Sequence, residues 1–565
     1  MSKNCMLLFI ALLAGLNFLN AGNNPGVPAA NPAYLIQLDK SFYVNGEVIW
    51  YKLLLPATPT HQGAAVKAVL SDRDGKTLFY TFLKNKRAPF VSGYYKIPFD
   101  LPGGMYRLSF LASEAITGQV FTLAYADLPI YNDGEKVVSD KVRSDSGPKN
   151  TPAVLETAGD VLKVSINLNA NTIRSRDQVL AGIRVTDANG QPVTASVSIA
   201  VNDHSLITVG GGQPTLIPGL AAPIAYQLDT SITFKGRLTD YQNQPLTANV
   251  LGVLTPQQNR IHYTRTQSPG QINLRLPDFY AQQPIQFLGF PQEEENIKVS
   301  LLPDEGLAAK GDLVYTPEIM HYLELSRQRK KIFQLYKDLE FNLQPSVPMV
   351  NVQELKPERT VNVKDYESFE NVYLFFKEIL TPLVFRQEKG EDKVEAKIFT
   401  DLGNRVYDML PGQPLFIIDG KATRDGNYVA HMKMDQVETV SIFTDRAELR
   451  QQFNVMGRSG VAIIETSSTD ITVPETDADD IFLVRGLQAP AAFPAFTPNQ
   501  IENDRHRPFF RPQLYWAPDV RTDASGQANV NFFQSDDTGD FQIRVLVQDE
   551  RGRMGYAEAV YQAVW

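Results

Sequence analysis

The sequence predicts a mainly β protein made of several β-sandwich domains in tandem, with one α+β domain and a connecting helix. The chain contains 37 Gly and 36 Pro, and its apolar segments are short, rich in aromatic and β-branched residues, and separated by turn sequences. A helical period replaces this pattern at residues 316–341 and 368–380. The length of 565 residues allows about three to five domains.

Residues 1–21 have the pattern of a cleaved signal peptide, with an uncleaved N-terminal anchor as the alternative. Lys3 precedes an apolar stretch from Met6 to Leu16, and Ala21 ends a small-residue cleavage site. Cys5, the only cysteine, lies before that site, so disulfides and thiol chemistry are not expected in the mature chain. We expect an exported protein, periplasmic or associated with the outer membrane or cell surface, with no transmembrane segment after cleavage.

The first expected domain covers residues 33–131. Its opening, YLIQLDKSFYVNGEVIWYKLLLP, holds two strand candidates joined across Asn45-Gly46, a dipeptide typical of hairpins. Residues 101–108, LPGGMYRL, lead from a turn into another strand. Residues 132–157 are polar and rich in turn residues, which predicts a linker.

Three later segments repeat the strand–turn–strand pattern, and each is expected to belong to a β sandwich. They are residues 158–230, 231–303 and 513–565. In the last of them the sequence TDASGQ, starting at Thr522, is a turn between two strands with alternating faces. The intervening residues 469–512 are acidic and then proline-rich, and we expect an extended connector there.

Residues 304–356 are expected to be a helical connector. Thr316 can cap a helix, Pro317 suits its first position, and Glu318 places an acid in its first turn. A second helical segment opens the α+β domain at residues 357–468 and stops before Pro382.

Residues 414–466 carry the most specific pattern of the chain. The predicted order is strand, turn, helix, strand, turn, strand, with the helix around Met434 to Val437. The first turn is Asp419-Gly420 and the second contains Gly457 and Gly460, because glycine tolerates the backbone conformations that turns need.

Two family resemblances follow from these motifs. Residues 34–56, 185–203 and 515–558 resemble elements of the macroglobulin domains of α2-macroglobulins, while residues 231–303 resemble either a macroglobulin or a carboxypeptidase-regulatory-like domain. Residues 414–466 resemble the plug domain of TonB-dependent outer-membrane receptors, with Asp419, Gly420, Gly457 and Gly460 in the motif positions. Together the motifs resemble large exported proteins of Bacteroidetes-type Gram-negative bacteria.

The resemblances also imply what is missing. About 100 residues follow Thr466, whereas one spanning strand takes about 10 residues, so we expect the plug-like domain to stand without a receptor-sized barrel. The α2-macroglobulin family traps proteases through a cysteine thioester, and the mature chain is expected to have no cysteine. Covalent trapping is therefore not expected.

No catalytic, cofactor-binding or metal-binding residues are predicted. The six histidines have no metal-ligand spacing. Acidic groups could bind calcium or simply make turns, and the turn interpretation is preferred; these groups are Asp72 and Asp74; Asp477, Asp479 and Asp480; and Asp536, Asp537 and Asp540.

The sequence therefore favours a non-catalytic cell-envelope scaffold or binding protein. It would act through β-sandwich surfaces and a plug-like docking module, with a cell-envelope protein or outer-membrane component as partner. The alternative is an accessory to TonB-dependent uptake. The acidic net charge of −9 argues against nucleic acid as a partner.

Overall fold

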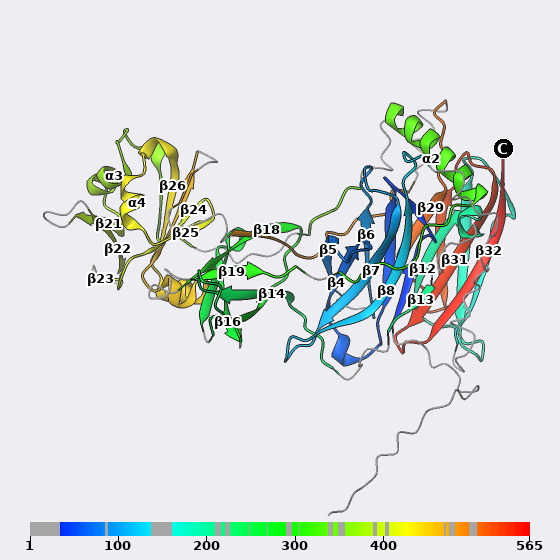
Figure 1. The fold of residues 1–565 in the computed structure, drawn as a ribbon, viewed down its shortest axis with the longest axis horizontal. Coiled ribbons are helices and arrows are strands. Elements are labelled where there is room, and N and C mark those ends of the chain that lie inside the picture. The colour runs from blue at the N-terminus through cyan, green and yellow to red at the C-terminus, as the bar shows by residue number, and fades with distance from the viewer. Residues whose placement is uncertain are drawn as a thin grey trace, which may run out of the picture.

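The computed structural model confirms the mainly β fold class (Figure 1). It describes residues 34–84, 89–136, 161–208, 216–220, 226–247, 249–267, 269–289, 297–303, 306–336, 343–348, 356–387, 393–401, 406–467, 471–473, 481–495 and 506–565. Four β-rich units form an elongated row (Figure 1). They are an α+β unit, a seven-stranded unit, and two β sandwiches called sandwich 1 and sandwich 2. The expected signal peptide lies outside the described residues.

Sandwich 1 is formed by two sheets around one core. The first sheet has the order β13-β1-β3-β6, with strands Leu216–Pro218, Leu35–Leu38, Val48–Leu54 and Phe90–Lys96. The second has the order β2-β8-β7-β4-β5, with strands Tyr43–Val44, Val120–Tyr131, Gly104–Ser113, Ala65–Ser71 and Thr77–Lys84. Large rings such as Tyr51 and Phe110 are fully buried between the sheets.

Sandwich 2 combines two distant parts of the chain. Its larger sheet has the order β10-β32-β31-β12-β29, with strands Thr172–Arg174, Met554–Val564, Gly539–Asp549, Ala195–Asp203 and Gln513–Arg521. Its smaller sheet has the order β30-β11-β9, with strands Gln527–Phe533, Gln178–Thr186 and Lys163–Leu168. Alternate residues of β11 are buried, as a strand with one face on a core requires.

This arrangement differs from the division that the sequence suggests. Residues 158–230 and 513–565 are expected as separate units, yet their strands share one sandwich and one core. The physical reason lies in β12, which is buried at every position except its last. Such a strand needs a neighbour at each edge, and β29 and β31 supply them. Within the same expected unit, β13 pairs with β1 of sandwich 1 instead.

The seven-stranded unit has the order β19-β14-β17-β16-β15-β18-β28. Its strands are Lys298–Leu301, Ile232–Thr239, Gln271–Leu276, Arg260–Gln267, Val250–Thr255, Gln282–Leu288 and Ile481–Arg485. β28 comes from the region expected to be a simple connector, and it covers the edge of β18. Pairing protects an edge that would otherwise expose its backbone groups.

The α+β unit lies at the end of the row opposite to sandwich 2 (Figure 1). Its main sheet has the order β20-β26-β27-β24-β25, with strands Arg359–Asn362, Val437–Phe443, Val461–Thr466, Leu415–Ile418 and Lys421–Thr423. A second sheet contains β21-β22-β23, with strands Leu383–Gln387, Val394–Asp401 and Tyr407–Met409. The helices α3, α4 and α5 are Val372–Glu378, Gly426–His431 and Arg446–Gln452.

The remaining helices include the predicted connector. The short α1, Ser205–Thr208, follows β12. The long α2, Pro317–Tyr336, begins as predicted, because the Thr316 hydroxyl accepts a hydrogen bond from the backbone N–H of Ile319 at 3.3 Å. Within the described part of the chain, no helix is long and apolar enough to span a membrane.

A buried lysine lies where sandwich 1 meets sandwich 2. Lys52 of β3 is only 1% exposed. Its Nζ atom donates hydrogen bonds to the Pro518 carbonyl at 2.7 Å and to the Ser196 hydroxyl at 3.3 Å. The loss of hydration on burial lowers the pKa of Lys52 to about 7. The interface therefore holds an amine that is charged only at or below neutral pH.

The protein is expected to gain stability as the pH rises from about 7 to about 10, because the unfolded chain binds a proton that folded Lys52 has released. Below about pH 7 both states are protonated and the penalty is complete. Lys52→Met should raise the free energy of unfolding at neutral pH by about 1–4 kcal/mol and flatten this dependence. Urea unfolding at about pH 7 and at about pH 10 measures how the free energy of unfolding depends on pH. Lys163→Met, at an exposed position in β9, is the control, and equal pH slopes for Lys52→Met and the parent protein would contradict the prediction.

Candidate functional site

The four plug-like motif residues lie in two turns of the α+β unit. Asp419 and Gly420 form the tight turn between β24 and β25, with φ angles of 47° and 83°, as a type I′ hairpin requires. Gly457 ends a short 3-10 helix, and Gly460 precedes β27. β24 and β27 run parallel, with Leu415 opposite Val461 and Ile418 opposite Ile464. The two turns are therefore at opposite ends of this strand pair and form no common site.

Three of the four motif residues have a clear structural role. The Asp419 carboxylate accepts hydrogen bonds from the Thr466 backbone N–H at 3.0 Å and from the Thr466 hydroxyl at 2.5 Å, which ties the hairpin to the end of β27. A side chain at Gly460 would meet Ile398 at 2.8 Å, and one at Gly420 would meet Pro256 of the seven-stranded unit at 2.8 Å. The glycines thus permit close packing.

The α+β unit is attached to the seven-stranded unit by an apolar and polar contact. Leu254 and Ile261 share a buried cluster with residues of β24 and α5. The Gln286 side chain accepts from the Ala422 backbone N–H at 2.7 Å and donates to its carbonyl at 3.2 Å. The Tyr263 hydroxyl donates to the Phe453 carbonyl at 2.7 Å. These bonds fix the β25 edge of the α+β unit.

The candidate metal ligands are engaged in local structure. The Asp72 carboxylate accepts hydrogen bonds from the backbone N–H groups of Asp74 and Lys76, both at 2.9 Å. This is the bonding of an aspartate that stabilises a turn. Burial opposes ionisation of Asp536, but hydrogen bonds from Arg176 and neighbouring groups lower its pKa. No group of three or more potential metal ligands occurs among the described residues. Asp477, Asp479 and Asp480 lie outside that part of the chain.

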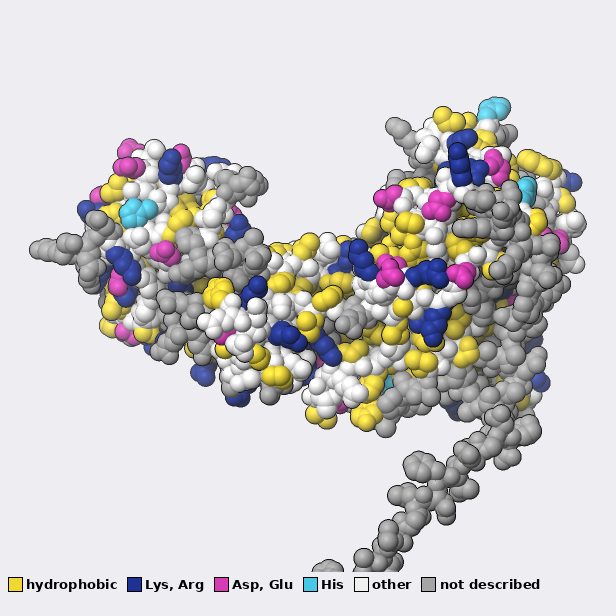
Figure 2. All heavy atoms as spheres, viewed as in Figure 1, with side chains coloured by type: hydrophobic (Ala, Val, Ile, Leu, Met, Phe, Trp, Pro, Cys, Tyr) yellow, Lys and Arg dark blue, Asp and Glu magenta, His cyan; other side chains and the backbone are white. Residues whose placement is uncertain are grey.

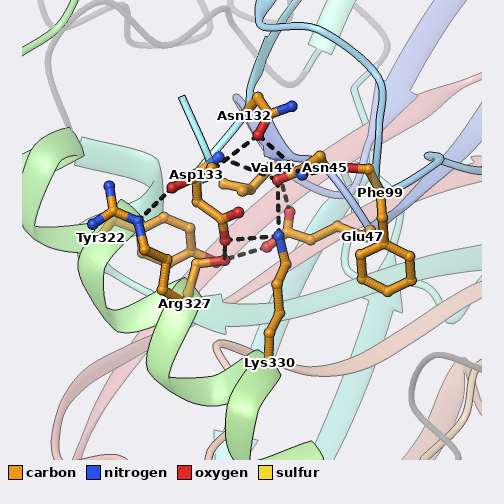
Figure 3. Close-up of polar contacts among 12 residues, drawn as sticks. Val44, Asn45, Glu47, Phe99, Asn132, Asp133, Tyr322, Arg327 and Lys330 are labelled. Carbon is orange, nitrogen blue, oxygen red and sulfur yellow. Dashed lines mark hydrogen bonds and ion pairs between the residues drawn. The ribbon is translucent and has the colours of Figure 1, made fainter. Parts of the chain in front are cut away.

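Helix α2 carries a polar cluster that joins it to sandwich 1 (Figure 3). Lys330 bonds to the Asp133 carboxylate at 2.7 Å and to the Asn45 side chain at 2.8 Å. The Tyr322 hydroxyl donates to Glu47 at 2.9 Å. Burial disfavours the Glu47 charge, but the Lys40 ammonium, 2.5 Å away, lowers the pKa of this carboxyl. Glu47 therefore stays ionised inside the cluster.

A small cavity, here called the basic pocket, lies beside this cluster. Its volume is about 60 Å³. Five cationic side chains and one carboxylate, Glu47, line it; the cations are Lys40, Lys96, Arg329, Lys330 and Arg511. Apolar walls come from Trp50, Phe333 and Phe493. The pocket thus combines an excess of positive charge with an apolar surface.

Arg329 has unused hydrogen-bonding capacity in this pocket. One terminal nitrogen of its guanidinium, NH2, bonds to Asp537 of sandwich 2 at 2.9 Å. The other, NH1, is buried and has no hydrogen-bond partner among the residues that the structure describes. The whole residue is only 8% exposed. A buried charged donor without an acceptor is unfavourable, and here it belongs to a residue that lines the basic pocket.

A larger cavity, here called the aromatic groove, lies between the two sandwiches. Its volume is about 630 Å³. Its lining comes from residues 82–84 of β5, residues 92–94 of β6, residues 487–493 and residues 515–518 of β29, together with Trp50 and Tyr280. Its half-buried rings include Tyr94, Phe493 and Tyr515. The volume is within the range of about 300–1,000 Å³ of typical ligand sites.

The basic pocket and the aromatic groove meet at a pair of rings. Trp50 and Phe493 line both cavities, and their ring centroids are 5.8 Å apart. Figure 2 shows hydrophobic side chains gathered on the sandwiches below α2, with charged side chains along the border. This ring pair therefore forms a wall that the two cavities share.

Sequence reasoning did not find either cavity. The pocket draws Lys40, Arg329 and Arg511 from segments far apart in the chain, and no spacing rule connects them. The signal that the sequence does offer is the cluster of Arg327, Arg329 and Lys330 on the predicted helix, which reads equally well as a solvated face.

The sequence and the fold can be compared with those of known proteins. The sequence matches no protein-family model, and no curated protein matches it. The fold is similar to the native form of E. coli α2-macroglobulin, with 9% identity, 96% of this chain and 40% of that chain covered, and a TM-score of 0.24. Methylamine-reacted Salmonella α2-macroglobulin is also similar, with 9% identity, 97% of this chain and 40% of that chain covered, and a TM-score of 0.24.

A tetra-tandem repeat from the extending region of a large adhesion protein is also similar, with 10% identity, 93% of this chain and 98% of that chain covered, and a TM-score of 0.14. This chain spans less than half the length of the bacterial macroglobulins. At such TM-scores the likeness carries no argument about activity or partners.

Proposed function

We propose that the protein is a non-catalytic binding protein of the cell envelope that holds an extended peptide segment of a partner in the aromatic groove. The observation that supports this most is the groove itself, a cavity of about 630 Å³ with aromatic walls at the junction of two sandwiches. Aromatic rings give large contact areas and keep polar atoms available for hydrogen bonds.

One edge of the groove already bonds to a peptide-like group. The Gln488 side-chain amide accepts from the Tyr94 backbone N–H at 3.0 Å and donates to the Tyr94 carbonyl at 2.7 Å. These are the two bonds that a neighbouring strand makes in β-strand addition. The β6 edge therefore has the geometry of strand addition, and at Tyr94 the Gln488 side chain of the same chain occupies the place of the added strand.

In this proposal the sandwiches are macroglobulin-like and the α+β unit is a plug-like docking module for an outer-membrane component. The leader-like residues 1–21 support export. The α+β unit lies at the far end of the molecule from sandwich 2, and the outline is concave between it and sandwich 1 (Figure 2). The two ends can thus contact separate partners. An accessory role in TonB-dependent uptake is the alternative.

Photo-cross-linking in intact cells tests the groove. Ala492 is exposed and lines the groove, whereas Ala495 is exposed and lines neither cavity. A photoreactive residue at position 492 is expected to capture one envelope protein through an extended segment, identified by mass spectrometry, and one at position 495 is not. Equal capture at both positions, or none at either, would count against the proposed function. Capture of an outer-membrane receptor would favour the uptake role.

Filling the groove gives the matching loss-of-function result. Ala492→Trp is expected to weaken binding of the captured segment at least about tenfold, because a bulky ring occupies the space that the ligand needs. Ala495→Trp adds the same ring outside the groove and should leave the affinity unchanged. Isothermal titration with the synthetic segment measures both. Unchanged affinity in Ala492→Trp would place the ligand elsewhere.

A further inference from the structure

We propose that the basic pocket binds a carboxylate of the peptide segment that lies in the aromatic groove, with Arg329 as its main hydrogen-bond donor. This inference rests on the proposed function and adds the chemical class of the ligand: an acidic peptide. It assigns a role to a cavity that the β-sandwich architecture does not itself require.

The first support is the unpaired donor. Arg329 NH1 is buried and unpartnered in the part of the chain that the structure describes, while NH2 is held by Asp537 at 2.9 Å. The ion pair fixes the guanidinium plane, so a carboxylate oxygen at NH1 would meet an already oriented donor. Preorganised, charge-assisted hydrogen bonds of this kind are short and strong.

The second support is the charge of the pocket wall. Glu47 is fully engaged, because Lys40 and Tyr322 bond to its two oxygens at 2.5 and 2.9 Å. Lys330 is balanced by Asp133 and Arg329 by Asp537. Lys96 and Arg511 add two further cations to the lining. The local balance is a small positive excess, which suits a singly charged anion.

The third support is size and polarity. A volume of about 60 Å³ is larger than the space that one water needs and accommodates a group such as a carboxylate. Trp50 and Phe493 form an apolar wall shared with the groove. An acidic side chain or chain terminus attached to an apolar peptide fits both surfaces, whereas a strongly hydrated phosphate would lose water at the apolar walls.

The experiment begins with the purified full-length protein and a displayed library of random peptides. Enriched peptides are expected to carry Asp or Glu at one fixed position next to apolar residues. A resynthesised peptide in which this acid is replaced by its amide should bind about 10- to 100-fold more weakly. A second peptide, amidated only at its C-terminus, distinguishes a side-chain carboxylate from a terminal one as the ligand.

Variants of the protein localise the effect. In Arg329→Gln the acidic and amide peptides should bind equally, which a double-mutant cycle measures directly. Lys96→Gln, at a half-buried position in the same lining, should reduce the difference partly and covers the case in which Arg329→Gln does not fold. Arg386→Gln, at an exposed position in the α+β unit, is the control and should keep the full difference.

The outcomes separate this inference from the proposed function. If Ala492→Trp abolishes peptide binding but the acidic and amide peptides bind within about twofold of each other, the groove stands and the carboxylate site is overturned. If no peptide is enriched, both fail. A difference between acidic and amide peptides that survives in both Arg329→Gln and Lys96→Gln also overturns the assignment, because the carboxylate then binds outside the pocket.

Discussion

Val545→Asp is expected to unfold sandwich 2, with a loss of more than about 4 kcal/mol in the free energy of unfolding. Val545 is completely buried at the centre of β31, opposite Ile199 of β12. A carboxylate there would lie among the apolar residues of the shared core, which favours its protonation or its exposure to water. The cost approaches the total stability of a domain, about 5–15 kcal/mol.

The location of the damage tests the two-segment construction of sandwich 2. Limited proteolysis of Val545→Asp is expected to open new cleavage sites in residues 163–203, far upstream of the substitution, because these strands lose their partners. Val560→Asp makes the same change at a position of β32 that is 47% exposed, and should alter stability by no more than about 0.5 kcal/mol. New cleavage confined to residues 513–565 would show that the two segments fold independently.

Gly460→Ala is expected to destabilise the α+β unit by about 2–5 kcal/mol, since it combines two penalties. The φ angle of Gly460 is 87°, a conformation that costs a residue with a side chain about 1–2 kcal/mol. The new methyl group would also lie 2.8–2.9 Å from three atoms of Ile398, and overpacking of a core adds about 1–3 kcal/mol.

Gly412→Ala separates these two penalties. Gly412 has a nearly equal φ of 82° in the same unit, but its added methyl group would meet only the Ser459 hydroxyl, at 3.2 Å. We expect Gly412→Ala to cost the conformational term alone. Urea unfolding followed by a probe in the α+β unit gives the two free energies. Equal losses in the two variants would mean that packing against Ile398 contributes nothing.

Much of the local structure could be predicted, because it depends on local chemistry. Thr316 and Pro317 mark the start of α2, and Asp419-Gly420 forms the hairpin turn that its residue types indicate. The helix predicted around Met434 to Val437 is a short 3-10 helix, Met434–Gln436, whereas the helices α4 and α5 were not predicted. The sequence does contain an N-cap residue for each of them. The Asp425 side chain accepts a hydrogen bond from the Tyr428 N–H at 2.9 Å at the start of α4, and the Asp445 side chain accepts one from the Glu448 N–H at 2.8 Å at the start of α5.

The pairing of distant strands could not be predicted, for a physical reason. Alternation along β30 shows which of its faces is buried, but the same pattern fits any partner strand with a complementary face. The pairing of β11 with β30 is decided by the packing of the whole core. The basic pocket has the same origin, because Arg329 and Asp537 meet only after both sandwiches and α2 have assembled.

The long separation between the two halves of sandwich 2 has a consequence for biogenesis. About 300 residues lie between Asp203 and Gln513, and they include most of the seven-stranded unit, α2 and the α+β unit. When the chain leaves the ribosome or a translocon from its N-terminus, β11 and β12 emerge long before their partners β29, β30 and β31. Their apolar faces stay uncovered until the last strands arrive, so completion of this domain is a late step in maturation, and a chaperone that shields those faces would act in that interval.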